Sequence, residues 1–560
     1  MIWKPTAPAD HQEVSALQEA LQVPSLIAQL LAQRKITTYA NAKAFFRPQW
    51  EALYDPFLMK DMDLAVARIE SAITSKEKIM IYGDYDVDGT TAVALVYSYL
   101  NTLAEVVCYI PDRYSEGYGI SKKSINTAQA EGISLIISLD CGIKAIDQVA
   151  YANSLGIDFI ICDHHQPGNQ LPSAVAILDP KQADCAYPFD GLCGCGIGFK
   201  LVQALMQPQG ATQEQLMPYL DLVATAIVAD IVPLIDENRI LTYFGLQQLH
   251  QAPRPGIAYF FKELKNKATV SDLVFKLAPR INAAGRMEHA IKAVDLLTAT
   301  TSEEVKPLAR TIEFNNSERR SKEEKITQEA LAQASQSQEA YTTVVFDAHW
   351  HKGVIGIVAS RLIEQYYRPT VVLTQSGDHW AGSVRSVRGF DVYCALEACQ
   401  DTLLQFGGHK YAAGLTLETH QLEAFKNRFE AFVQAQIKPD QRAPQLIYDL
   451  EVVLDQISPK VCRIMAQMAP FGPQNMRPVL VTHQCKDTGG SRAVGQDQAH
   501  LRLELTDPSG ATFTGIGFNQ ASNLLAIKSQ NPFSICYTVE ENHFNNQVSL
   551  QLKIKDLRFD

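Results

Sequence analysis

The sequence predicts an α/β protein with a parallel-sheet domain, a smaller α/β domain joined to it by a long helix, and a C-terminal OB-like β-barrel. Short β-branched runs alternate with helix-like segments between residues 78 and 180, which is typical of a parallel sheet covered by helices on both faces. A long polar stretch follows at residues 300–340, and short strands of alternating polarity occupy the chain after Pro444, as in a small barrel.

Length and composition describe a globular protein with several cores. The chain has 560 residues, of which 46% are hydrophobic and 20% are charged, and a chain of this length is expected to form about three to four domains. We expect a helical N-terminal segment at 1–45, the parallel-sheet domain at 46–250, a helical connector at 251–335, the smaller α/β domain at 336–440 and the barrel at 441–560.

Some classes of protein are excluded at this level. The N-terminus lacks the basic start and apolar core of a signal peptide, and the apolar run at 222–235 is broken by Asp230 and Pro233, so no membrane span is expected. The 11 cysteines are odd in number and lie mostly in apolar runs, which predicts reduced thiols in a cytoplasmic protein. The net charge of −11 means that a nucleic-acid partner must be argued from local clusters.

The expected elements run as follows. The first 45 residues are predicted to be helical, with apolar positions at helical spacing from Val14 to Leu31. Parallel strands are expected at 79–82, 106–110, 135–139, 159–162 and 175–178, with a helix at 90–100 and mainly helical structure from 180 to 250. The polar stretch at 300–340 favours a long exposed helix over a disordered linker.

The second half of the chain repeats the change of pattern. Strands at 342–346 and 370–373 flank a helix at 354–364, which predicts a second α/β unit. Apolar and polar residues then alternate at 446–454, 479–483, 500–505, 512–518, 533–539 and 548–554, which predicts five or six barrel strands.

Acidic and imidazole side chains follow three of the predicted parallel strands. These are Asp84, Asp86 and Asp88 after the first, Asp140 after the third, and Asp163, His164 and His165 after the fourth, with Asp230 after a later apolar run. Ligands gather at the carboxyl ends of such strands. The spacing of the first three acids also matches the start of an EF-hand calcium loop. That loop needs Glu at its twelfth position, where this sequence has Leu95. A plain acidic surface turn is the other alternative for that segment.

The donor set indicates the metal and the chemistry. Carboxylates with imidazole and no thiolate favour Mn²⁺ or Mg²⁺, and so many carboxylates suffice for two ions. Two neighbouring ions support attack of water on phosphorus, and the predicted helix at 90–100 would offer backbone N–H groups to an anion. Phosphoester hydrolysis is therefore the predicted reaction class. The pair Cys193 and Cys195 has the wrong spacing for a metal motif, and we expect a structural turn there.

These motifs resemble the DHH phosphoesterase family. Asp163-His164-His165 resembles its signature triplet, and the segment 407–414 resembles the Gly-Gly-His motif of the associated DHHA1 domain. The segments 279–286 and 471–475 narrow the resemblance to bacterial exonucleases specific for single-stranded DNA. The resemblance runs from about residue 45 to the C-terminus. One departure occurs: Gln474 replaces a glycine in a Phe-Gly-x-Gly-Asn motif near the barrel, away from the chemistry.

The resemblance implies roles for the acidic set. It makes Asp86, Asp88, Asp140, His164 and Asp230 the metal ligands. Asp84 and His165 would be ligands or adjacent supporting groups, and Asp163 would orient a histidine, as metal-bound imidazoles usually require.

It also implies how a single strand is held, with basic groups for phosphates and flat side chains for bases. Arg113 and Tyr118 would supply both, in a segment that is otherwise a plain surface turn. Ser383 and Arg385, in a predicted loop, would recognise a terminal 5′-phosphate, with Gly408 and His409 on the same side of the cleft. The alternative for His409 is a buried structural role.

Other basic residues are weaker candidates. Arg280 and Arg286 would line the DNA path or form structural salt bridges. Lys486, Arg492 and Arg502 are candidate DNA contacts of the barrel, or part of a solvated face.

The function that follows is metal-dependent 5′→3′ exonuclease action on single-stranded DNA in recombination and repair. The implied partners are single-stranded DNA, with single-strand-binding protein and a helicase as candidates, and the protein is expected to be a monomer. Two alternatives stay open: a DHH phosphodiesterase for short RNA or cyclic dinucleotides, and a non-catalytic DNA-binding scaffold.

Overall fold

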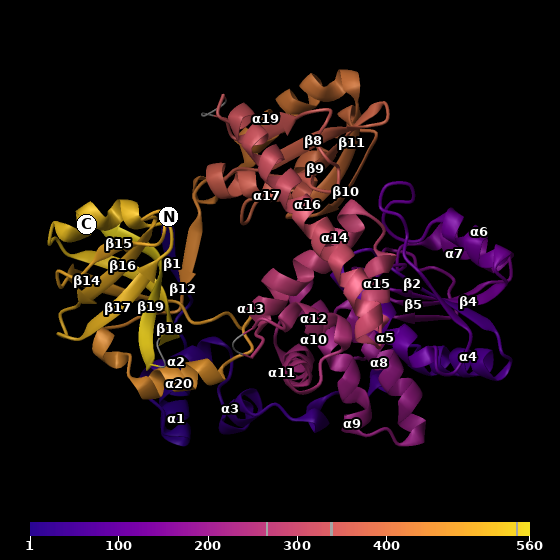
Figure 1. Cartoon of the computed structure of the whole chain (residues 1–560), viewed down its shortest axis with the longest axis horizontal. Coiled ribbons are helices and arrows are strands. Elements are labelled where there is room, and N and C mark those ends of the chain that lie inside the picture. Colours follow the sequence, from indigo (N-terminus) through magenta and orange to yellow (C-terminus); the bar gives the residue numbers. More distant parts are fainter. Residues whose placement is uncertain (265–266, 337–339, 545–546, 560) are drawn as a thin grey trace. The chain divides into compact units, whose positions relative to one another are not determined.

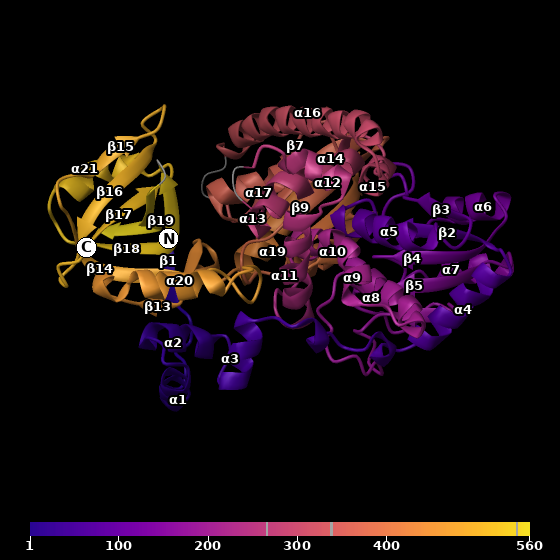
Figure 2. The ribbon, with the colours of Figure 1, turned by 60° about the horizontal axis from the view of Figure 1, so that its bottom comes forward.

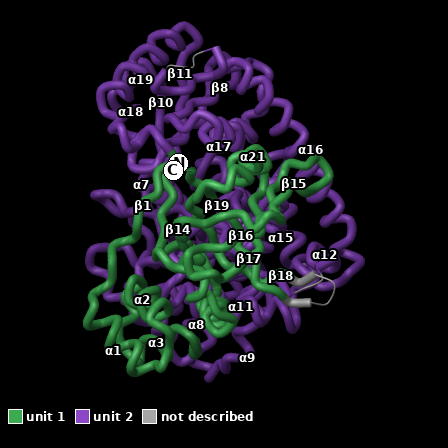
Figure 3. Tube along the Cα trace, turned by 90° about the vertical axis from the view of Figure 1, so that its left-hand side faces the viewer, with its two compact units in different colours: residues 1–49, 444–560 green, residues 50–443 purple. Residues whose placement is uncertain are grey.

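The computed structural model describes residues 1–264, 267–336, 340–544 and 547–559 (Figures 1 and 2). The chain forms two compact units, residues 1–49 with 444–560 and residues 50–443 (Figure 3). Among the described residues, no helix combines the length and apolarity that a membrane span requires.

The second unit contains the predicted parallel sheet. Its strands are β2 (Lys78–Gly83), β3 (Val106–Tyr109), β4 (Ile133–Leu139), β5 (Asp158–Cys162) and β6 (Ala176–Leu178). They pair in the order β3-β2-β4-β5-β6, all parallel. The five strand predictions are confirmed, and so is the fold class.

Both faces of this sheet are buried, which explains the continuous apolar runs. Ile79 and Ile81 of β2 belong to one core, which includes residues of α4 (Met62–Thr74), α5 (Val87–Leu100) and α8 (Gly194–Met206). Met80 and Tyr82 belong to the opposite core, with residues of α6 (Lys122–Ala130) and α7 (Ile146–Ser154). The parallel sheet is therefore packed between helices on both of its faces.

Helices carry the chain from this sheet to the next domain. They are α9 (Gln213–Leu216), α10 (Leu220–Ala229), α11 (Asp236–Gln251), α12 (Pro255–Phe261), α13 (Val270–Asp272), the π-helical η5 (Leu273–Leu277), α14 (Ala278–Met287), α15 (Ile291–Thr298) and α16 (Ser302–Ala334). The long helix is confirmed as α16, and the disordered-linker alternative is wrong. Thr301 caps its first turn by accepting from the backbone N–H of Glu304.

The long helix joins two cores. Val305, Ala309 and Ile312 pack into the core of the parallel-sheet domain. Ile326 and Ala330 pack with residues of α17 (Ile355–Tyr366) in the core of the following domain. In Figure 1 the helix is seen running between the two.

The second α/β domain has a mixed sheet. Its strands are β7 (Thr343–Phe346), β8 (Thr370–Ser376), β9 (His379–Arg385), β10 (Gln405–His409) and β11 (Ala412–Glu418), in the order β10-β11-β9-β8-β7, with α18 (Val392–Glu397) and α19 (Leu422–Gln436). Only the β7–β8 pair is parallel. The predicted loop at Ser383 and Arg385 is wrong, because both residues lie in β9, paired on each side.

The first unit holds the barrel. Its elements are β1 (Ile2–Pro5), α1 (His11–Leu21), α2 (Ser25–Gln33), α3 (Tyr39–Phe46), β12 (Gln445–Tyr448), β13 (Leu450–Glu451), α20 (Pro459–Gln467), β14 (Leu480–Asp487), β15 (Arg492–Val494), β16 (His500–Thr506), β17 (Thr512–Gly517), α21 (Leu524–Lys528), β18 (Phe533–Phe544) and β19 (Gln547–Phe559). Strands β14, β18, β19, β17 and β16 form a ring that the β14–β16 pairing closes. The predicted barrel is confirmed.

Two local predictions in this unit need correction, and one is confirmed in more detail. The chain opens with a strand, β1, which pairs in parallel with β12. The helical prediction for Val14 to Leu31 is confirmed, as two helices, because Pro24 cannot continue the first and stands at the N-cap of the second. The single strand expected at 446–454 is divided at Asp449, whose carboxylate accepts from the backbone N–H of Val479.

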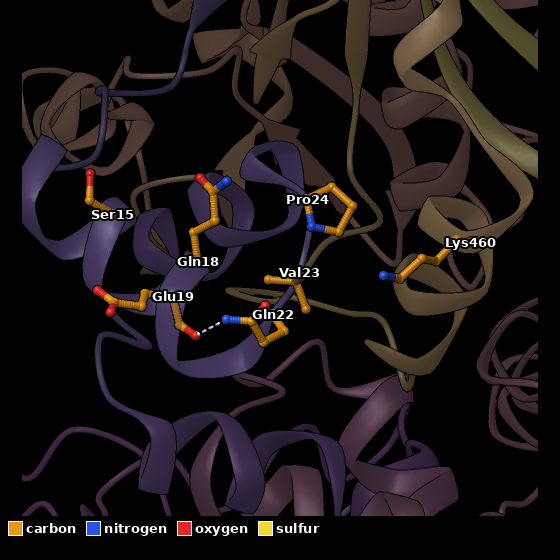
Figure 4. Close-up of a pocket in the computed structure, with 7 residues that line it drawn as sticks. All are labelled: Ser15, Gln18, Glu19, Gln22, Val23, Pro24 and Lys460. Carbon is orange, nitrogen blue, oxygen red and sulfur yellow. Dashed lines mark hydrogen bonds between the residues drawn. The ribbon is translucent and has the colours of Figure 1, made fainter.

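A shallow groove of about 550 Å³ lies beside α1, α2 and α20 (Figure 4). Glu19 and Lys460 are the charged side chains among the residues that line it. It therefore lacks the donors of the site described below.

A buried ion pair holds the start of the second unit. Lys200 Nζ lies 2.6 Å from Glu237 Oε1, and both side chains are inaccessible to solvent. The ammonium also donates to the Tyr54 carbonyl, and the carboxylate accepts from the Tyr54 N–H and the Tyr187 hydroxyl. Both charges are thus satisfied, which a buried pair requires.

Removing one member should be costly. We expect Lys200→Met to lower the free energy of unfolding by about 3–5 kcal/mol, because Glu237 would be left buried and unpaired. Urea titration of the full chain measures this. The control is Lys60→Met, whose partner Asp184 is exposed and whose loss should change little. Equal effects of the two substitutions would contradict the account.

Candidate metal centre

The first group of acids surrounds the junction of β2 and α5. Asp84 follows the strand, Asp86 is the N-cap of the helix, and Asp88 lies in its first turn. The Asp86 carboxylate accepts from the Gly89 N–H at 3.1 Å, so the helix begins at Val87, three residues before the predicted start. A Cβ on Gly89 would lie 2.4 Å from the Asp84 carbonyl oxygen, which explains the glycine that ends the acidic run.

The other acids come from separate elements. Asp140 follows β4 with a φ of 59°, and its N–H donates to the Cys162 carbonyl, which fixes it to the end of β5. Asp163, His164 and His165 follow β5. Asp230 lies at the C-terminal end of helix α10, so its prediction as one more strand-end acid is wrong. It still reaches the same site.

His164 is the centre of the cluster. Its Nε2 lies 3.2 Å from Asp140 Oδ1, 3.6 Å from Asp230 Oδ2 and 3.7 Å from Asp88 Oδ2. Three sets place their ligand atoms within 4.8 Å of one another: Asp88 with His164 and Asp230, Asp140 with His164 and His165, and Asp84 with Asp86 and Asp140. The seven residues therefore form one continuous group with room for more than one set of ligands.

The residues fit a divalent cation. Asp84 Oδ1 and His164 Nδ1 are buried without a hydrogen-bond partner. Burial, followed by the charge of Asp86, raises the pKa of Asp84 to about 8, and burial, followed by Asp88, raises the pKa of Asp230 to about 8. Burial and neighbouring carboxylates also raise the pKa of Asp140 well above its ordinary value. These carboxylates lack sufficient positive charge, which a hard divalent ion would supply.

Asp163 has a different role from its neighbours. Its Oδ1 lies 2.7 Å from His165 Nδ1 and accepts the backbone N–H groups of His164 and His165, while Oδ2 accepts from Ile143 N–H. Burial opposes ionisation, but these hydrogen bonds outweigh it and lower the pKa of Asp163. Asp163 was expected to orient a histidine, and it orients His165. The Nε2 atom of His165 is not used by Asp163.

The pair Cys193 and Cys195 was predicted to form a structural turn, and the structure corrects this. Both begin α8, where the N–H groups of Gly194 and Cys195 donate to the two oxygens of Asp88 at 2.6 and 2.8 Å. A Cβ on Gly194 would lie 2.5 Å from that of Asp140. Burial raises the pKa of both thiols, so they do not resemble metal ligands. In the sequence, the only sign of this role was the small residue Gly194 between the apolar residues Cys193 and Cys195.

Asn238 is a second residue that sequence reasoning missed. It is fully buried, and its Nδ2 donates to the Gly191 carbonyl at 2.6 Å and the Pro233 carbonyl at 2.9 Å. Gly191 leads into the helix start that holds Asp88, and Pro233 follows Asp230. The Asn238 amide thus connects the segment that leads to the Asp88-binding helix start with the segment that follows Asp230.

Arginines lie close to Asp84 and Asp86 of the cluster. Arg113 lies 3.8 Å from the ring centre of Tyr85 and donates to the Gly285 carbonyl. Arg286 donates to the Gly353 carbonyl, and burial, followed by Arg113 and Arg385, lowers its pKa to about 10. The two segments are thereby joined beside the acids.

The second α/β domain contributes to the same region. Arg385 donates to Ser383 Oγ at 3.1 Å. A Cβ on Gly356, in the first turn of α17, would meet both side chains, so that helix starts against them. His409 is exposed on the β10–β11 hairpin, so the alternative of a buried structural histidine is wrong. Partial desolvation of its ring by neighbouring atoms, followed by the charge of Arg385, lowers the pKa of His409, and His165 also contributes.

Of the remaining predicted residues, Tyr118 lies at the acidic cluster, and the others lie elsewhere. The Tyr118 hydroxyl lies 3.4 Å from His165 Nε2 and 3.4 Å from the Asp140 carbonyl, with the side chain largely exposed. Arg280 donates to the Lys276 carbonyl and lies over the Phe260 ring. Neither Arg280 nor Arg286 forms an ion pair with a described residue, so the salt-bridge alternative finds no support. In the barrel, Arg492 and Arg502 lie near Glu504, and Lys486 is exposed.

Comparisons with known proteins agree with this arrangement. The family model "DHH family, N-terminal domain" matches residues 78–227, the DHHA1 domain matches 338–435 and the RecJ OB domain matches 448–556. The chain is 38% identical to the single-stranded-DNA-specific exonuclease RecJ of Bacillus subtilis, over 99% of this chain and 70% of that protein. It is 32% identical to RecJ of Salmonella typhimurium, over 96% of each.

A solved structure shows the same fold. RecJ of Thermus thermophilus in complex with Mn²⁺ superposes with a TM-score of 0.87 at 27% identity, covering all of this chain and 80% of that one. A Mg²⁺ complex of the same protein gives a TM-score of 0.80 at 25% identity, covering all of this chain and 78% of that one.

The Asn238 bridge can be tested by metal affinity. We expect Asn238→Ala to weaken Mn²⁺ binding by about 10- to 100-fold, the usual cost of removing a group that positions ligands. Isothermal titration calorimetry measures it. Asn475→Ala is a matched control, because this buried amide also donates to two carbonyls, those of Met468 and Pro470, in the other unit. Equal Mn²⁺ affinities in the two variants would refute the bridge.

Proposed function

Because the chain belongs to the RecJ family of single-stranded-DNA-specific exonucleases, we propose that its acidic cluster is the centre that hydrolyses the DNA backbone from the 5′ end. The observation that carries the proposal is the gathering of carboxylates with His164 and His165, in which no acid forms an ion pair with a described lysine or arginine. Such a group is stable when metal ions provide the missing charge.

The ligand assignment follows the geometry. We assign Asp86, Asp88, Asp140, His164 and Asp230 as ligands of Mn²⁺ or Mg²⁺. Asp84 and His165 complete the two ends of the group, and Asp163 keeps His165 in place. Two bound ions would supply an activated water and stabilise the leaving oxygen.

The chain's own residues would bind and orient the strand. Ser383 and Arg385, against the start of α17, suit a terminal phosphate, since a guanidinium fork and helix N–H groups both match its oxygens. Gly408 has a φ of 144°, and a Cβ there would lie 2.4 Å from the Ala412 carbonyl oxygen, so the hairpin carrying His409 stays thin. Holding the 5′ end at a set distance from the metals would make cleavage directional.

Arg113 and Arg286 would continue this path toward the metals, with Tyr118 offering a ring to a base. Arg280 is the outlying member of the set, since its guanidinium faces Phe260.

The wider organisation is proposed on the same basis. The chain would divide into domains at residues 45, 250, 335 and 440. The barrel, after residue 440, would help to bind the strand. Single-strand-binding protein and a helicase are candidate partners of a monomeric, cytoplasmic enzyme. The alternative substrates, short RNA or cyclic dinucleotides, are not favoured, because the similarity to the exonucleases includes the barrel. The scaffold alternative conflicts with the complete acidic set.

Loss of one central ligand should abolish activity. We expect Asp140→Ala to reduce Mn²⁺-dependent degradation of 5′-phosphorylated single-stranded DNA by more than about 10²-fold, since active-site electrostatic groups contribute at least this much. Asp401→Ala, at an exposed ion pair with Arg428, is the control, and circular dichroism verifies folding. Unchanged activity would disprove the site, and a wild-type protein that cuts only dinucleotides would disprove the substrate.

The 5′-phosphate site makes a separate prediction. We expect Arg385→Ala to raise KM about 10- to 100-fold for 5′-phosphorylated DNA, the worth of a hydrogen bond to a charged group, and to leave 5′-hydroxyl DNA unaffected. Arg388→Ala, an exposed arginine three residues away, should change neither KM. An equal rise for both substrates would argue against phosphate recognition.

A further inference from the structure

A second cavity adjoins the metal centre on the side of the parallel sheet. It has a volume of about 230 Å³ and is lined by Tyr118, Ile143, Lys144, Gln148 and His165, among others. We propose that this cavity binds the base of the second nucleotide, the one on the 3′ side of the bond that is cut. The inference rests on the proposed function and adds a base-binding subsite to it.

The lining has the chemistry that a base requires. Tyr118 presents a ring that is 57% exposed, and Ile120 and Ile143 supply apolar surface. The half-buried Gln148 brings an amide with both a donor and an acceptor, and Lys144 lies exposed at the same cavity. A flat ring accepts any base, while an amide can pair with a base edge. The combination suits a nucleobase without strong sequence preference.

The walls of the cavity are tied to the catalytic residues. Asp163 accepts the Ile143 N–H at 2.9 Å through one oxygen and contacts His165 Nδ1 at 2.7 Å through the other. Tyr118 is placed by its hydroxyl against His165. A base seated here would therefore be in fixed register with the imidazole of the metal centre.

The position selects the second nucleotide over the first. The proposed 5′-phosphate site uses Ser383 and Arg385 of the second α/β domain, whereas every residue that lines this cavity lies between 118 and 165. The terminal nucleotide has to span from Arg385 to the metals. We place in the cavity the base that follows the cut bond, beside His165 and Tyr118.

A substrate lacking one base tests the assignment. We compare single-turnover cleavage, with Mn²⁺, of 5′-phosphorylated oligonucleotides that are intact or abasic at nucleotide 1 or nucleotide 2. For the wild type, loss of base 2 should slow the first cut about tenfold, the order of one stacking contact. In Gln148→Ala this penalty should shrink about three- to tenfold, the worth of one hydrogen bond, while the penalty for losing base 1 stays the same.

Gln129→Ala, an exposed glutamine on α6 of the same domain, is the matched control and should show wild-type penalties. Unaltered penalties in Gln148→Ala, or a change that appears at base 1 instead, would overturn the inference. If the wild type fails to degrade even the intact oligonucleotide, the proposed function itself fails, and this outcome is distinguishable from the other two.

Discussion

The repulsion between carboxylates gathered around one imidazole is the constraint on which the rest of this structure depends. Asp88, Asp140 and Asp230 all lie within 4 Å of His164 Nε2, and burial makes their charges costly. No isolated turn could hold such a group. The surrounding fold provides hydrogen bonds and close backbone packing, and the metal would provide the remaining positive charge.

The N-termini of two helices stabilise the carboxylates. The N-termini of α5 and α8 direct N–H groups at Asp86 and Asp88, where the helix dipole also favours negative charge. Glycines at 89 and 194 let two backbones approach the acids more closely than any side chain would allow. The amide of Asn238 then joins the loop before α8, whose first N–H groups bind Asp88, to the loop after Asp230.

Positively charged side chains lie close to the negatively charged acidic cluster. Arg113, Arg286 and Arg385 come from two domains and lie near one another, with Arg286 also near Asp86. Helix α16 connects those domains by entering both cores. Within that helix, Glu323 pairs with Arg319 and with Arg361 of α17, so the domain that carries Arg385 is attached to a rigid element. The arrangement suits an anionic strand that must reach the metals from one direction.

The strands of the parallel sheet, the long helix, the barrel and nearly the whole acidic set could be predicted from the amino-acid sequence, because β-branched runs, helical periodicity and residues at strand ends are local features. It misplaced Asp230 on a strand, put Ser383 in a loop, and overlooked Asn238 and the start of α8. Those roles depend on contacts between residues far apart in the chain: Cys195 with Asp88, Asn238 with Gly191, and Ser383 with Gly414 of β11. These contacts become visible only in the folded chain, since a backbone N–H or an amide acquires its function from the partner that folding brings to it.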